Sequence, residues 1–242
     1  MFDLDGTLAE SKSALLPDMG RLLCRLLTKK RVAIIGGGKY EQFQKQFLSS
    51  FHCSPKLLTR LFLFPTSSTA FYRYQNRWKR VYSHVLPRAS RTKIFKAFNR
   101  ALAAAHFVYP KKIYGKLIED RGTQVTFSAL GQKAPVHLKE AWNKKHDLRV
   151  AIMRFLQKDL PEFEVRRGGL TSIDVTKKGI DKAYGIRQIK KVLHISISEM
   201  LFIGDALYLG GNDYAARKTG VTCVQVVGPI VTKRVIAFLL GS

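Results

Sequence analysis

The stretch Phe2-Asp3-Leu4-Asp5-Gly6-Thr7 decides the fold that this sequence predicts. Residues two apart on a strand face the same side, so Asp3 and Asp5 at the carboxyl end of a strand both reach one crevice. One carboxylate can attack a phosphoryl group and form an aspartyl-phosphate, while Asp5 transfers protons as a general acid and base. Two carboxylates so close repel each other, so the pair calls for a cation such as Mg²⁺. The alternative from this pattern alone is an acidic strand end followed by a turn.

The formal net charge of +25 is extreme for 242 residues, and no Asp or Glu occurs between Glu41 and Glu119. Such a charge suggests nucleic acid, an anionic surface or anionic small substrates as partners. The sequence shows no recognisable nucleic-acid-binding module, so we expect any nucleic-acid binding to be incidental to the basic surface. We also expect a cytoplasmic protein without a membrane segment, because acidic residues stand near position 1 and charged residues interrupt the apolar stretch 221–240.

The cysteines are odd in number and widely spaced: Cys24, Cys53 and Cys223. This pattern predicts reduced thiols of a cytosolic protein, and neither a disulfide framework nor a zinc site.

The order of apolar segments predicts an α/β fold, a Rossmann-like parallel-sheet core with an inserted α+β cap domain. Strands and helices alternate at both ends of the chain, whereas the middle mixes hairpins and helices. We expect core residues at 1–80, the cap at 81–177 and the rest of the core at 178–242. The first strand is expected to be short, because only Met1 and Phe2 precede Asp3.

A glycine run, Gly36-Gly37-Gly38, follows the apolar strand 31–35 and precedes a predicted helix. Backbone N–H groups of Gly37 and Gly38 at such a turn can cradle a phosphate. The alternative is a tight turn that binds nothing.

A second carboxylate ends a later strand, in Leu201-Phe202-Ile203-Gly204-Asp205. Ligands of open parallel sheets lie beyond the carboxyl ends of the strands, so we expect Asp3 and Asp205 to share one crevice. Lys182 begins a predicted helix and can neutralise a phosphoryl oxygen and the nucleophile. Asn212 and Asp213 can steady the loop or Lys182, or cap the helix that begins there.

With these motifs the chain resembles the haloacid dehalogenase superfamily in its α+β-capped subclass, and within it the eukaryotic-type phosphomannomutases. The motifs that carry the resemblance are Phe2 to Thr7, Val32 to Gly38, Ser128-Ala129-Leu130-Gly131-Gln132, Ser172-Ile173-Asp174, Gly179-Ile180-Asp181-Lys182, Gly204-Asp205 and Gly210-Gly211-Asn212-Asp213. The resemblance implies Asp3 as nucleophile and Asp5 as general acid and base. It also implies Mg²⁺ held by Asp3, Asp205 and the backbone carbonyl of Asp5.

The resemblance extends to substrate binding by the cap. Arg121 matches a cap arginine of the family, and Ser172 and Asp174 match its sugar-contacting serine and aspartate. The family resemblance further implies a homodimer formed through the cap.

Some positions depart from the family pattern. Lys12 and Lys139 stand where the family has arginines, which keeps the charge but loses the bidentate fork. Gln132 replaces a phosphate-binding arginine, and the run from Gly36 to Gly38 lacks the hydroxyl that bonds the transferring phosphate in the superfamily. Loss of one such contact commonly costs about 10²-fold in rate.

The sequence thus predicts an enzyme that interconverts hexose 1-phosphate and hexose 6-phosphate, with Mg²⁺ as cofactor and a hexose 1,6-bisphosphate as activator. A sugar-phosphate phosphatase of the same superfamily is the alternative among enzymes. A nucleic-acid-binding protein on an enzyme scaffold is the alternative from another class.

Overall fold

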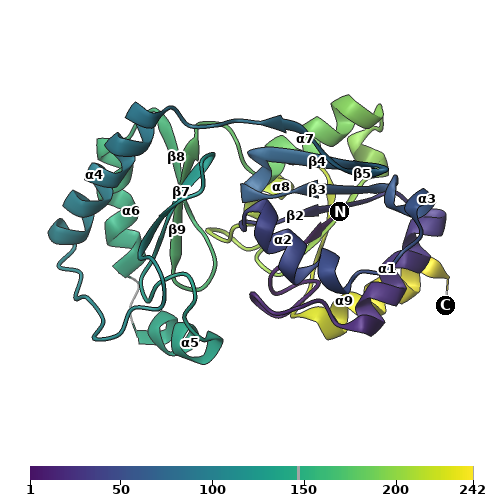
Figure 1. Ribbon diagram of the computed structural model, residues 1–242, viewed down its shortest axis with the longest axis horizontal. Coiled ribbons are helices and arrows are strands. Elements are labelled where there is room, and N and C mark those ends of the chain that lie inside the picture. The colour runs from purple at the N-terminus through teal and green to yellow at the C-terminus, as the bar shows by residue number, and fades with distance from the viewer. Residues whose placement is uncertain (146–147, 242) are drawn as a thin grey trace. The chain divides into compact units, whose positions relative to one another are not determined.

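The computed structural model describes residues 1–145 and 148–241, which form two compact units (Figure 1). The core unit comprises Met1–Ser83 and Asp181–Ser242, and the inserted unit comprises His84–Ile180. Among the described residues, no helix combines the length and the apolar character needed to cross a membrane.

The core unit is built on a sheet with strand order β11-β10-β1-β2-β3-β4-β5 over the described residues. The strands from β11 to β3 are parallel to one another, and the last two join the edge in antiparallel fashion. This architecture confirms the predicted α/β class with a parallel core sheet. The strands are β1 (Phe2–Asp3), β2 (Val32–Ile35), β3 (Leu61–Phe64), β4 (Ala70–Gln75), β5 (Arg77–Ser83), β10 (Leu201–Gly204) and β11 (Thr222–Gln225).

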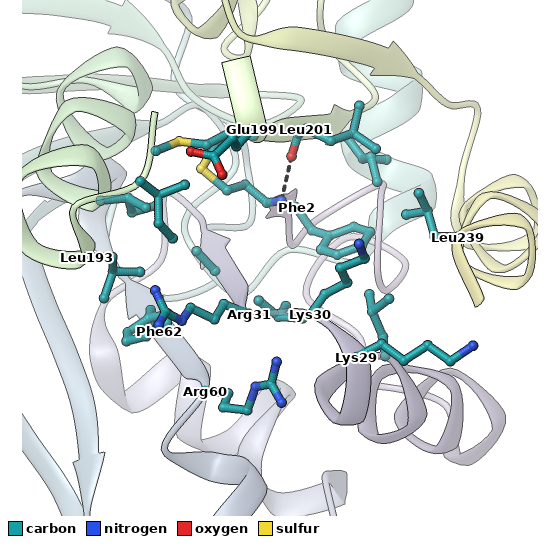
Figure 2. A pocket seen from close by; sticks show the side chains of 18 residues that line it. Phe2, Lys29, Lys30, Arg31, Arg60, Phe62, Leu193, Glu199, Leu201 and Leu239 are labelled. Carbon is teal, nitrogen blue, oxygen red and sulfur yellow. Dashed lines mark hydrogen bonds between the residues drawn. The ribbon is translucent and has the colours of Figure 1, made fainter. Parts of the chain in front are cut away.

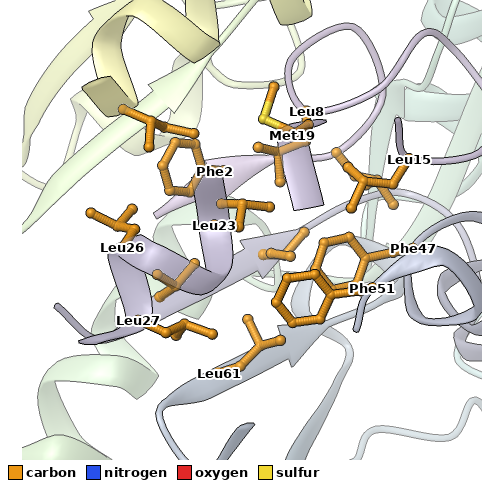
Figure 3. Packing of buried hydrophobic residues seen from close by; sticks show 14 of the residues in the cluster. Phe2, Leu8, Leu15, Met19, Leu23, Leu26, Leu27, Phe47, Phe51 and Leu61 are labelled. Atoms are coloured by element: carbon orange, nitrogen blue, oxygen red, sulfur yellow. The ribbon is translucent and has the colours of Figure 1, made fainter. Parts of the chain in front are cut away.

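Helices cover both faces of this sheet, because the side chains of its buried strands alternate between two apolar clusters. Val32 and Ile34 join the cluster of α1, α2 and α9, which Figure 3 shows around Phe2. Ala33 and Ile35 join the cluster on the other face, with α7 and α8. The helices of the core unit are α1 (Pro17–Lys29), α2 (Tyr40–Gln46), α3 (Pro55–Leu58), α7 (Lys182–Leu193), α8 (Tyr214–Arg217) and α9 (Pro229–Leu240), with 3₁₀ turns at Leu48–Ser50, Thr66–Ser68 and Ile197–Glu199.

The prediction of three reduced thiols is wrong, because Cys24 and Cys53 form a disulfide. Cys24 lies on α1, and Cys53 lies just before α3; their Cα atoms are 5.7 Å apart. Both side chains pack against the same apolar cluster, so folding brings together two cysteines that the sequence separates by 29 residues. Cys223 is a free thiol.

A cavity of about 520 Å³ lies at the amino ends of the parallel strands, between the side chains of Phe2, Phe62, Leu193 and Leu201 (Figure 2). The Met1 nitrogen donates a hydrogen bond of 2.6 Å to the Leu201 carbonyl at its border.

The inserted unit is an antiparallel sheet of order β6-β7-β9-β8 with helices packed on one face. Val125, Phe127, Ile173 and Val175 alternate onto that face and meet the apolar sides of α4 and α6. The elements of this unit are α4 (Arg88–Ala104), β6 (Ile118–Asp120), β7 (Gln124–Ser128), α5 (Val136–Lys145), α6 (Leu148–Asp159), β8 (Phe163–Arg167) and β9 (Ser172–Lys177).

Candidate active site

Three carboxylates meet at the carboxyl ends of the parallel strands. Asp3 ends β1, Asp205 directly follows β10, and Asp213 comes from the loop before α8. One oxygen from each lies within 4.8 Å of the others. The expected meeting of Asp3 and Asp205 is therefore present in the core unit, and both side chains are largely withdrawn from solvent.

Lys182 connects two of these carboxylates from the first turn of α7. Its Nζ donates to Oδ1 of Asp3 at 2.7 Å and also to Oδ1 of Asp213. The helix begins at this position because the Asp181 carboxylate caps it by accepting from the Tyr184 N–H at 2.7 Å. The ammonium is 2 % exposed, so a buried cation stands between two buried anions.

Burial opposes charge on Asp3, Asp205 and Lys182. It raises the pKa of the Asp3 carboxyl well above the usual value, against the Lys182 ammonium, which lowers it. Burial and the Asp213 carboxylate raise the pKa of Asp205. Burial alone would lower the pKa of Lys182, but Asp213 and Asp3 outweigh it and raise that pKa, so the ammonium stays protonated.

The donor set fits a divalent hard cation. With all groups ionised, three carboxylates face one ammonium, which leaves two negative charges unbalanced. Oδ2 of Asp3 is buried without a hydrogen-bond partner, although a buried carboxylate oxygen normally has one. Carboxylate oxygens are the ligands that Mg²⁺ prefers. These residues could therefore hold Mg²⁺, with Asp3 and Asp205 supplying oxygens; the predicted carbonyl ligand of Asp5 stays a prediction.

Asp213 and Asn212 differ in what they contact. Oδ2 of Asp213 accepts from the Ala206 N–H at 3.0 Å while its other oxygen binds Lys182, so this side chain fixes both the loop and the lysine. Asp213 stands at the N-cap position of α8, but its side chain makes no capping hydrogen bond to that helix. Asn212 lies half-buried beside it.

Gly6 allows the loop after β1 to approach Asp205, which follows β10. Its φ of +81° is favourable for glycine, and a Cβ there would lie 2.7 Å from Oδ2 of Asp205. Thr7 then donates from Oγ1 to Oδ1 of Asp205 at 3.3 Å. The residues that follow the predicted nucleophile thus position the carboxylate of another strand.

Asp5 is held separately from the acidic cluster. Its Oδ1 accepts from the Lys12 N–H and from Nε2 of Gln46, both at 2.7 Å. Gln46 in turn accepts from Gln42 at 2.9 Å. Lys12 therefore touches Asp5 through its backbone, and its own backbone has a φ of 59°. Sequence reasoning missed Gln46, whose only signal is a polar residue between two buried apolar positions, Phe43 of α2 and Phe47 directly after that helix.

The glycine run is clamped by the loop that follows β3. The carbonyl of Gly38 accepts from the Thr66 N–H at 2.8 Å, and that of Gly36 accepts from the Ser67 N–H at 2.9 Å. A trans peptide is planar, so fixing these carbonyls also turns the N–H groups of Gly37 and Lys39 to the opposite side. Thr66 and Ser67 adopt left-handed φ values of 48° and 53°, a strained backbone that places their N–H groups on the glycine run.

In the inserted unit the structure joins two predicted residues. Arg121 donates from its guanidinium to Oε1 of Gln132 at 2.8 Å and to Glu119 at 2.9 Å. Gln132, expected where the family pattern has an arginine, is thus a hydrogen-bond partner of Arg121.

The remaining predicted residues of this unit also lie largely buried. Oδ1 of Asp174 accepts from Thr126 at 2.7 Å, and Ser172 donates to Ser128 at 3.2 Å. Strand register puts these pairs on the sheet face opposite the helices, because Thr126 pairs with Asp174 and Ser128 with Ser172. Lys139 of α5 is also buried.

Most of the chain matches a known protein family. The family model described as eukaryotic phosphomannomutase matches residues 19–241. The chain belongs to the eukaryotic phosphomannomutase family. Relatives in this family include the phosphomannomutase of Encephalitozoon cuniculi, 30 % identical over 234 residues, which cover 88 % of this chain and 82 % of that protein. Phosphomannomutase 2 of Dictyostelium discoideum is 25 % identical over 222 residues, 88 % of this chain and 84 % of that protein.

Solved structures share the fold with lower identity. An IMP-bound, N-terminally truncated Plasmodium falciparum IMP-nucleotidase superposes with a TM-score of 0.71 at 15 % identity, over 100 % of this chain and 67 % of that one. Aspergillus fumigatus trehalose-6-phosphate phosphatase gives a TM-score of 0.58 at 15 % identity, over 100 % of this chain and 92 % of that one. Membership of the phosphomannomutase family identifies the chain as an enzyme, either a mutase or a phosphatase, and confirms the resemblance described above.

Proposed function

We propose that this phosphomannomutase-family protein is a Mg²⁺-dependent phosphomutase that interconverts the 1-phosphate and 6-phosphate of mannose or glucose. The observation that carries the proposal is the buried cluster in which Lys182 joins Asp3 and Asp213 beside Asp205. A buried nucleophile with a charged neighbour at the carboxyl end of a parallel sheet suits phosphoryl transfer.

Each proposed step moves one phosphoryl group. An oxygen of the Asp3 carboxylate attacks phosphorus, the bond from phosphorus to the sugar oxygen breaks, and Asp5 gives a proton to that oxygen. In the return step a sugar hydroxyl attacks the aspartyl-phosphate, Asp5 takes the hydroxyl proton, and the Asp3 carboxylate is released. A hexose 1,6-bisphosphate, which loads the enzyme in the first step, is therefore the expected activator.

The neighbours of Asp3 have distinct proposed tasks. The Lys182 ammonium lowers the repulsion between the nucleophile and an incoming phosphate. Mg²⁺, when bound, would supply further positive charge to the transferring phosphoryl oxygens. The N–H groups of Gly37 and Gly38 are proposed to bind the phosphate in place of the absent hydroxyl.

We propose that the inserted unit is the cap domain that recognises the sugar and its second phosphate. Arg121 and Lys139 would supply positive charge, and Ser172 and Asp174 would bind sugar hydroxyls. The support is the family pattern, together with the polar sheet face on which Ser172 and Asp174 lie. A mutase needs such a cap because water must be kept from the aspartyl-phosphate.

A phosphatase acting on sugar phosphates is the second candidate. One observation favours it: the neutral amide of Gln132 accepts from Arg121, so the family's second arginine is absent and the first is already engaged. A weaker hold on the distal phosphate would favour release of the sugar after one transfer.

The test measures turnover of mannose 1-phosphate and glucose 1-phosphate with Mg²⁺ and the matching 1,6-bisphosphate. Formation of hexose 6-phosphate by the unmodified protein, and its loss in Asp3→Asn, is the expected result. Asp18→Asn is the matched control, because Asp18 is a half-buried carboxylate of the same unit that pairs with Lys233 and not with Lys182. Inorganic phosphate without hexose 6-phosphate would instead establish the phosphatase, and equal activity in both variants would exclude Asp3 as nucleophile.

A further inference from the structure

The strong basic charge is a feature that phosphoryl transfer leaves unexplained. The stretch between Glu41 and Glu119 has no acidic residue, and within the core unit it includes the hairpin of β4 and β5. Arg73, Arg77, Lys79 and Arg80 all fall on this hairpin, and the last three are exposed. The hairpin forms the edge of the core sheet, at β5 (Figure 1).

Strand pairing sorts the hairpin into two faces. Tyr74 pairs with Trp78 and Tyr72 with Arg80, so these four side chains share one face of the hairpin. Lys79 pairs with Arg73 and belongs to the opposite face. Cations therefore lie on both faces. Tyr72, Tyr74 and Trp78 share one face, whereas Phe71 and Tyr82 pack into the apolar cluster on the other face.

Four aromatic side chains form what we call the aromatic ladder: Tyr40, Tyr72, Tyr74 and Trp78. The rings of Tyr40 and Tyr72 stack with centroids 3.9 Å apart and planes 7° from parallel. Tyr74 and Trp78 meet edge to face at 5.6 Å. All four are half-buried, so each ring is anchored in the protein while part of it remains accessible.

We propose that the β4–β5 hairpin binds single-stranded nucleic acid. Accessible rings on a sheet face provide stacking surfaces for unpaired bases, and neighbouring arginines and lysines pair with phosphates. A duplex does not offer its base faces to such rings. An anionic membrane fits less well, because membrane insertion needs exposed apolar side chains. Within the described hairpin, Val81 is the one large apolar side chain that is exposed.

The experiment measures fluorescence anisotropy of labelled 12-nucleotide RNA and DNA single strands, the corresponding duplexes, and vesicles of anionic phospholipid. The double variant Arg77→Gln/Lys79→Gln removes two exposed charges from the hairpin. Its matched control, Lys190→Gln/Lys191→Gln, removes two exposed charges from the last turn of α7 in the same unit. Both double variants should keep the phosphoryl-transfer activity of the unmodified protein.

We expect single strands to bind more tightly than duplexes or vesicles. The hairpin double variant should lower affinity about tenfold and reduce the slope of log K against log salt by about 1.4, whereas the control should change little. Tyr74→Leu, which keeps apolar bulk but removes a stacking ring, should reduce the preference for single strands. Equal losses in hairpin and control variants, or equal binding of duplexes or vesicles, would overturn the proposal. The RNA and DNA arms identify which single strand is preferred.

Discussion

The two ends of the parallel strands in the core unit are built from opposite chemistry. At the carboxyl ends, three carboxylates and one ammonium are withdrawn from water and held against one another. At the amino ends, a cavity of about 520 Å³ is lined mainly by apolar side chains, together with Lys29, Lys30, Arg31, Arg60 and Glu199 (Figure 2). None of the predicted site residues lines that cavity. At the carboxyl ends, burial of charged groups lowers the stability of the fold. At the amino ends, the cavity leaves room for apolar contacts that would raise it.

The largest expected effect comes from removing the cation of the carboxyl end. Lys182→Met leaves Asp3 and Asp213 buried without their partner, and breaking a buried pair in this way typically costs about 3–5 kcal/mol. Urea unfolding without metal should show this loss, and Mg²⁺ should restore part of it by balancing the carboxylates. Turnover should fall at least 10²-fold, because Asp3, the proposed nucleophile, loses its neighbouring charge.

Lys190→Met is the control for this comparison, since Lys190 lies on the same helix and is exposed. It should shift the unfolding midpoint little. If Lys182→Met unfolded at the same urea concentration as Lys190→Met, the buried pairs would not be a source of stability.

A smaller effect is expected at Asp5, which also lies at the carboxyl end of the sheet. Its hydrogen-bond donors there are uncharged groups, a backbone N–H and a side-chain amide. Gln46→Leu removes one of its two donors, and hydrogen bonds to a charged group contribute about 1.5–3 kcal/mol. Because the Lys12 N–H remains, we expect kcat to fall about tenfold with little change in KM.

Gln42→Leu tests whether the effect on Asp5 is direct. Gln42 reaches Asp5 only through Gln46, to which it donates at 2.9 Å. Steady-state kinetics should therefore place this variant close to the unmodified protein. Equal kcat values for the Gln46 and Gln42 variants would show that Gln46 does not position Asp5, the proposed general acid and base.

Much of the carboxyl end could be predicted from the sequence, because its signals are local. A strand followed by a carboxylate occurs at Asp3 and again at Asp205, and parallel strands bring such ends together. The contact between Lys182 and Asp213 could be predicted because the helix and the loop that carry them both begin at the carboxyl edge of the sheet. The resemblance to phosphomannomutases added the roles of these residues.

Contacts between distant segments were harder to predict. The Cys24–Cys53 disulfide depends on how α1 packs beside the segment before α3, and a spacing of 29 residues carries no sign of this. Gln46 looked like an ordinary polar residue of a helix, yet it turns inward to Asp5. The loop of Thr66 and Ser67 adopts left-handed backbone without a glycine, so the usual sequence signal for that conformation was absent.

The smallest expected effect tests the amino end. Ala33 lies on β2, is 3 % exposed and borders the cavity. Ala33→Val adds two methyl-sized groups and suits a strand, so filling part of the space should raise the free energy of unfolding by about 1 kcal/mol. Turnover should not change, because the substitution lies at the end of the sheet away from Asp3. Ala33→Thr is the control, since threonine has the shape of valine but replaces one of its methyl groups with a hydroxyl and so gains less apolar contact. A lower urea midpoint for Ala33→Val would mean that the added groups meet packed atoms instead of the cavity, and that the amino end is already as well packed as its strands allow.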